Sequence, residues 1–100
     1  MFQPACHSEE LTKCSTEEIV NAYDNTIRYT DQFLSQVIDL LAESDRVAGA
    51  MYYVSDHGES LGENGIYLHG TPMFMAPEVQ YKVPMVIWTS EGYRQGMAAD

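Results

Sequence analysis

A long amphipathic helix, which we predict from Ser15 to about Glu43, constrains the fold of this chain more than any other feature. Ser15 and Glu18 have the spacing of a capping box, in which each side chain bonds the backbone N–H of the other residue. Mostly apolar side chains then recur at every third or fourth position, as on one face of a helix. This stripe comprises Val20, Tyr23, Ile27, Thr30, Leu34, Val37 and Leu41, and it is widened by Ile19 and Ile38. The stripe predicts that one face of the helix packs against a core.

Two short apolar runs predict strands. Residues 50–54 do not alternate in polarity, which is typical of a strand covered on both faces, as in parallel sheets. Residues 83–88 are similar, and their proline stands near the start, where a strand tolerates one. The order helix, strand, long loop, strand indicates an α/β fold. One helix covers only one face of a sheet, so we expect one long helix and at least two buried strands that belong to a larger domain.

Charge and hydropathy exclude several classes of function. Asp and Glu outnumber Lys and Arg by fifteen to five, which gives a net charge of −10. Such a chain repels phosphate backbones and anionic lipids, so we expect no nucleic-acid partner and no membrane contact by this segment itself. No apolar run approaches the roughly 20 residues of a membrane-spanning helix. The first residues also lack the basic and apolar regions of a signal peptide.

The two cysteines, Cys6 and Cys14, are eight positions apart. This spacing does not match the tighter pairs of common metal sites. It is compatible with a disulfide that stabilises by roughly 2–3 kcal/mol, and equally with two unrelated buried thiols. A disulfide would place the chain in an oxidising compartment.

The loop between the predicted strands, residues 55–82, carries the chemically informative side chains. Asp56 and His57 stand where the first strand ends, and ligands bind at the carboxyl ends of strands in open α/β sheets. A carboxylate and an imidazole are both zinc ligands, and Gly58 permits the turn that lets adjacent side chains share an ion. His69 follows twelve positions after His57 and is a candidate further ligand or phosphoryl-binding group. The Asp-His pair alone is also compatible with ordinary loop polarity.

Together these segments resemble the phosphoethanolamine transferases that modify lipid A, a family that includes enzymes of polymyxin resistance. The matching stretches are residues 21–27, 29–31, 34–38, 54–65, 67–72, 76–78 and 83–85. The most specific is Asp-His-Gly-Glu-Ser-Leu-Gly-Glu-Asn-Gly, which begins at Asp56. Asp-His-Gly alone would indicate only the broader alkaline phosphatase and sulfatase superfamily.

The resemblance implies a fold, a site and an activity. Residues 1–100 would be the C-terminal portion of a catalytic domain, a fragment of an alkaline-phosphatase-like, sulfatase-type α/β/α sandwich. Asp56 and His57 match the family's zinc ligands. His69 matches a histidine that contacts the phosphoethanolamine group or an additional zinc. Cys6 and Cys14 match one of the family's periplasmic disulfides.

The family transfers phosphoethanolamine from phosphatidylethanolamine to lipid A at the periplasmic face of the inner membrane. Zn²⁺ activates a threonine, which carries the group as a covalent intermediate. That threonine, a zinc-binding glutamate, another substrate histidine and the transmembrane helices lie upstream of the matching segments. Thr26, Thr30 and Thr71 do not stand in the family's nucleophile context. We therefore expect the chain alone to be inactive, to bind zinc weakly, and to meet the membrane only through the missing transmembrane domain.

Some residues and alternatives stay open. Glu59 and Glu63 receive no role, and His7 is interpreted as a surface histidine because it lacks a partner at metal-site spacing. A sulfatase or a phosphoglycerol transferase is an alternative from the same superfamily, against which the long Glu-Asn-Gly loop argues. A small non-catalytic binding domain that keeps a remnant of the fold is the second alternative.

Overall fold

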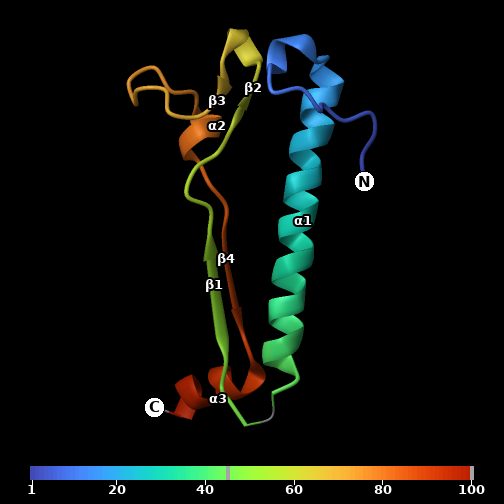
Figure 1. Cartoon of the computed structure of the whole chain (residues 1–100). Coiled ribbons are helices and arrows are strands. Elements are labelled where there is room, and N and C mark those ends of the chain that lie inside the picture. The colour runs from blue at the N-terminus through green and yellow to red at the C-terminus, as the bar shows by residue number, and fades with distance from the viewer. Residues whose placement is uncertain (45, 100) are drawn as a thin grey trace. The chain divides into compact units, whose positions relative to one another are not determined.

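The computed structural model describes residues 1–44 and 46–99 (Figure 1). Its elements are α1 (Thr16–Ala42), β1 (Ala50–Val54), β2 (Ser60–Leu61), β3 (Tyr67–Leu68), α2 (Glu78–Tyr81), β4 (Met85–Thr89) and α3 (Glu91–Ala99), with short 3-10 helices at Leu11–Lys13 and Glu63–Gly65. They form two compact units. The first unit holds Met1–Tyr29 and Ser55–Val83, and the second holds Thr30–Val54 with the C-terminal segment from Pro84. Helix α1 contributes its first half to one unit and its second half to the other.

Helix α1 begins with the predicted capping box. The backbone N–H of Ser15 donates to Glu18 Oε2 at 2.7 Å, and the N–H of Glu18 donates to Ser15 Oγ at 3.2 Å. Each bond satisfies a donor that the first turn of a helix leaves without an intrahelical acceptor. The helix ends at Ala42, one residue before the predicted end.

The predicted apolar stripe of α1 is only partly covered. Ile19 is buried, whereas most of the stripe is half-buried and Ile27 is exposed. Ile19 was expected at the margin of the stripe, and it is the most buried position because it lies in the first unit, among the residues that surround the disulfide and the β2–β3 hairpin. No helix in the described part of the chain is long and apolar enough to cross a membrane.

The second unit confirms both predicted strands, which pair with each other. Strands β1 and β4 are antiparallel, with Ala50 opposite Thr89 and Val54 opposite Met85. The comparison with parallel sheets therefore does not extend to this pair, because a continuous apolar run indicates cover on a strand, not the direction of its neighbour. The strands are also less buried than predicted, since Met51 is buried while its neighbour Tyr52 is 64% exposed. The described residues therefore cover one face of β1 and leave the other open.

The first unit is held together by contacts to its N-terminal segment. Cys6 and Cys14 form the disulfide that the resemblance implied. The N–H of Cys6 donates to the carbonyl of Glu18 at 3.0 Å. One helical turn apart, the amides of Asn21 and Asn25 bond the backbone of Pro4 and Phe2, at 2.8 Å from Asn21 Nδ2 to the Pro4 oxygen. These bonds fasten the segment that precedes the helix along the first half of α1.

We expect the capping box to contribute measurably to stability. Ser15→Ala removes the acceptor for the Glu18 N–H and should lower the free energy of unfolding by about 1 kcal/mol. Urea unfolding followed by circular dichroism at 222 nm measures this change. Glu17→Ala is the matched control, because Glu17 lies in the same first turn but makes no capping bond to Ser15. Equal stability of the Ser15→Ala and Glu17→Ala variants would contradict the assignment.

Candidate metal centre

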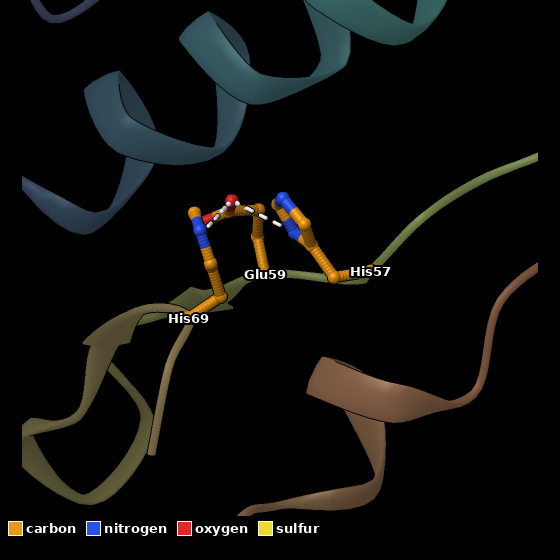
Figure 2. A group of neighbouring side chains, drawn as sticks. All are labelled: His57, Glu59 and His69. Atoms are coloured by element: carbon orange, nitrogen blue, oxygen red, sulfur yellow. Dashed lines mark hydrogen bonds and ion pairs between the residues drawn. The ribbon is translucent and has the colours of Figure 1, made fainter.

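Three side chains of the first unit converge on one point of the loop that follows β1 (Figure 2). One ligand atom from each of His57, Glu59 and His69 lies within 4.8 Å of the other two. Glu59 Oε1 lies 2.8 Å from His69 Nδ1 and 3.5 Å from His57 Nδ1. The two imidazole rings stack with their centroids 3.6 Å apart and their planes inclined by 21°.

Local backbone geometry explains why these three residues meet. His57 and Glu59 are two positions apart in the segment that leads into β2, and their side chains meet with Glu59 Oε1 3.5 Å from His57 Nδ1. Strands β2 and β3 are antiparallel, with Ser60 opposite Leu68. Continuing that register by one residue places Glu59 opposite His69, as a cross-strand pair. The hairpin thus brings together residues ten positions apart in the chain.

The predicted pair Asp56 and His57 also lies together. His57 Nε2 is 3.7 Å from Asp56 Oδ2, and the backbone N–H of His57 donates to Asp56 Oδ1 at 3.0 Å. On the other side of the ring, Nδ1 lies 2.9 Å from the carbonyl oxygen of Gly58. A carbonyl only accepts, so Nδ1 carries the proton in this bond and leaves the Nε2 lone pair available on the side of Asp56.

This donor set fits a divalent cation such as zinc. A metal-binding histidine usually donates its second ring N–H to a carbonyl or carboxylate, as His57 does to Gly58 and His69 does to Glu59. Zinc binds imidazole nitrogen and carboxylate oxygen at about 2.0–2.2 Å, so ligands of one ion lie about 3–4 Å apart. The distance between His57 Nε2 and Asp56 Oδ2 already falls in this range. His57 therefore belongs to two donor sets, one with Asp56 and one with Glu59 and His69.

The stacked rings share one carboxylate neighbour. Glu59 Oε1 lies beside both imidazoles, so a negative charge borders the point where they meet. The three side chains are all open to solvent, with Glu59 the most covered. The site is therefore accessible from outside.

Glu59 was missed by the sequence reasoning, which gave it no role. The signal that identifies it is the spacing His57-x-Glu59 before β2, combined with the hairpin register that places His69 opposite Glu59. Neither signal is visible without the assignment of β2 and β3, each of which is only two residues long.

Gly58 is required for a reason that differs from the expected one. A Cβ atom at this position would lie 1.7 Å from the carbonyl oxygen of Val79. The N–H of Gly58 donates to the carbonyl of Gln80 at 2.9 Å. Gly58 is absent from the described residues with positive φ, so close backbone approach, and not a left-handed turn, demands glycine here.

Gln80 ties the segments around the site together, and it too was missed. Its side chain is buried, and Nε2 donates to Ser60 Oγ at 2.8 Å and to Thr71 Oγ1 at 3.1 Å. Its Oε1 accepts the N–H of Thr71 at 3.3 Å. Gln80 therefore bonds Gly58, Ser60 and Thr71. Each member of the His57, Glu59 and His69 cluster lies within two residues of one of these bonded positions.

A cavity of about 330 Å³ adjoins the cluster through Glu59. Most of its other lining residues are apolar or small, namely Cys6, Ser8, Leu11, Ile19, Ala22, Tyr23, Thr26, Ser60, Leu61 and Leu68. Such a cavity offers space for an uncharged part of a bound molecule next to the polar cluster.

Comparison with known proteins identifies the family. The sulfatase family profile matches residues 1–100. The chain belongs to the sulfatase family. Its relatives include phosphoethanolamine transferase EptA of Salmonella typhimurium, which is 47% identical over 99% of this chain. Phosphatidylethanolamine transferase Mcr-1 of Escherichia coli is 50% identical over 90% of the chain.

Solved structures confirm the α/β fold of this sulfatase-family chain. The integral membrane protein lipooligosaccharide phosphoethanolamine transferase A (EptA) from Neisseria meningitidis matches 94% of the chain with a TM-score of 0.90 and 50% identity, over 18% of its own length. The C-terminal periplasmic domain of EptC from Campylobacter jejuni matches 97% of the chain with a TM-score of 0.88 and 47% identity, over 32% of its length. The chain spans 18% of EptA of S. typhimurium and 17% of Mcr-1. The predicted resemblance to phosphoethanolamine transferases is confirmed.

We expect the Gly58 contact to be essential for the geometry of the site. Gly58→Ala introduces a methyl group that overlaps a backbone oxygen, so the bond to Gln80 should break and stability should fall by about 2 kcal/mol or more. Urea unfolding measures the loss. Gly92→Ala is the matched control, because a Cβ at Gly92 meets nothing within 4 Å. A Gly58→Ala variant as stable as Gly92→Ala would show that the close approach is not a constraint.

Proposed function

We propose that this chain supplies the metal-binding loop of a zinc-dependent enzyme that transfers phosphoethanolamine from phosphatidylethanolamine to lipid A. The observation that carries the proposal is the meeting of His57, Glu59 and His69 beside Asp56. The relatives named as phosphoethanolamine transferases support the reaction class.

Each residue of the site has a distinct role in this proposal. Asp56 and His57 hold Zn²⁺, with His57 oriented by its Nδ1–H bond to Gly58. His69 binds the phosphoethanolamine group or helps to hold an additional ion. Glu59 orients His69 through their 2.8 Å hydrogen bond and balances positive charge between the stacked rings. When bound, zinc supplies positive charge that favours a threonine alkoxide and stabilises the phosphoryl oxygens.

The covalent intermediate of the proposed reaction forms on a threonine outside residues 1–100. The contacts of two threonines within the chain support this placement. Thr71 Oγ1 accepts a bond from buried Gln80, and Thr26 Oγ1 donates to the carbonyl of Tyr23 at 2.7 Å. These bonds give both hydroxyls a structural role. Phosphoryl transfer depends mainly on positioning and charge neutralisation, which the cluster provides from its side of the reacting group.

We further propose that residues 1–100 are a partial catalytic domain at the periplasmic face of the inner membrane. The open face of β1, where Tyr52 is exposed, and the exposed Ile87 of β4 support additional layers of a larger sandwich. The Cys6–Cys14 disulfide fits an oxidising compartment, and the matching domain of EptC is periplasmic. Phosphatidylethanolamine and lipid A would be the substrates of the complete enzyme.

Zinc binding should depend on the cluster. We expect His57→Ala to weaken Zn²⁺ binding by the full chain at least about tenfold, because this residue belongs to both donor sets. Glu59→Gln and His69→Ala should weaken it as well. Isothermal titration calorimetry gives the dissociation constants. His7→Ala is the matched control, since His7 lies outside the cluster. Identical zinc uptake by the His57→Ala variant and the unchanged chain would refute the metal role.

The chain alone should not catalyse the transfer. With phosphatidylethanolamine as donor and lipid A as acceptor, we expect no mass increase of lipid A by one phosphoethanolamine group. The nucleophile that the proposal requires is not supplied by these residues. Mass spectrometry of the extracted lipid measures the product, with a complete EptA as the positive control. Turnover by the purified chain, free of host enzyme, would contradict the proposed placement of the threonine.

A further inference from the structure

Three consecutive large apolar side chains point into solvent on the loop between β3 and α2. Met73 is 72% exposed, Phe74 87% and Met75 62%. In Figure 1 this segment projects away from the β2–β3 hairpin of the same unit. Clusters of large apolar side chains at the surface mark interaction sites, whereas single exposed ones do not. We name residues 72–76 the apolar loop.

The apolar loop is held in place at its base. Thr71, which precedes it, is bound through both its N–H and its hydroxyl to buried Gln80. Within the loop, the N–H of Met75 donates to the carbonyl of Pro72 at 2.8 Å. Pro77 follows the loop and leads into α2. The base of the apolar loop is thus fixed, while its three large apolar side chains stay exposed.

The charge of this segment contrasts with that of the whole chain. Residues 70–77 contain no charged side chain, although the chain carries a net charge of −10. The nearest acidic residue after the loop, Glu78, forms an ion pair with Lys82 at 2.7 Å. A projecting tip that is apolar and uncharged meets little electrostatic repulsion from anionic lipid headgroups. The acidic remainder of the chain would be repelled by them.

The position of the apolar loop links it to the metal centre. It begins three residues after His69, and Gln80 bonds both the start of the loop and the segment next to Glu59. Any surface that receives the loop therefore lies next to the cluster. Relatives of this chain are named for phosphatidylethanolamine, and one is an integral membrane protein, so the surface nearest to such an enzyme is a phospholipid bilayer.

We propose that the apolar loop inserts Met73, Phe74 and Met75 into the interfacial region of a bilayer rich in phosphatidylethanolamine. Burial of these side chains removes apolar area from water, which favours the bound state. The headgroups at that surface then lie next to His69. This second step rests on the proposed function, whereas the insertion itself does not. The proposal replaces the expectation that contact with the membrane is made only by transmembrane helices.

Tryptophan fluorescence tests the insertion directly. In the full chain carrying Trp88→Phe, which removes the single native tryptophan, Phe74→Trp places a probe on the apolar loop. Vesicles of phosphatidylethanolamine and phosphatidylcholine, with and without brominated acyl chains, are added in a buffer that contains a chelator. We expect a blue shift of the emission and quenching by the brominated chains. Phe33→Trp, at an exposed position of α1, is the matched control and should show neither.

A partition measurement supplies the second readout. Phe74→Ser should lower the partition coefficient onto these vesicles about tenfold or more in flotation, whereas Phe33→Ser should leave it nearly unchanged. Equal losses in the two variants would overturn the proposal. So would an emission of the Phe74→Trp variant that is already blue-shifted without vesicles and does not respond to them, because another protein surface would then cover the loop. Vesicle binding by the chain, together with an absence of transferase activity in a complete enzyme that contains it, would refute the proposed function and leave the insertion intact.

Discussion

The contact between Gly58 and the backbone around Gln80 is the constraint on which the rest of the first unit depends. It joins the extended segment after β1 to the short helix α2 with no space for a side chain. Gln80 then uses its buried amide to hold Ser60 and Thr71. A buried amide that is bonded on both its oxygen and its nitrogen stabilises one arrangement of the chain, because any other leaves polar groups unsatisfied. The positions of the histidines follow from this arrangement.

The resulting site combines a fixed backbone with open side chains. The side chains of His57 and His69 remain accessible, while Gln80 holds the segments that carry them through hydrogen bonds. Under the proposed function, a membrane-borne substrate would approach this open site from outside. The cavity beside Glu59 and the apolar loop beyond His69 flank the polar cluster with apolar surface.

Much of the fold could be predicted from the sequence, because the governing interactions are local. The capping box and stripe of α1 depend on spacings of three and four residues, and β1 was predicted with its observed bounds. The direction of β4, the role of Gln80 and the inclusion of Glu59 could not be predicted in this way. Each depends on which segments far apart in the sequence become neighbours, and short strands such as β2 leave almost no periodic signal. The proximity of Asp56 and His57 was predictable because adjacent residues need only a local bend.

The antiparallel register of the β2–β3 hairpin has a consequence for how this kind of protein can change over time. Glu59 meets His69 only because Ser60 pairs with Leu68, and the turn between the strands sets that pairing through the left-handed residues Gly62 and Gly65. A one-residue insertion or deletion in the turn would shift the partner of Glu59 and move its side chain to the opposite face. Selection that preserves the pairing of Glu59 with His69 thus also preserves the number of residues in the turn. Descendants therefore cannot alter the length of the turn without separating Glu59 from His69.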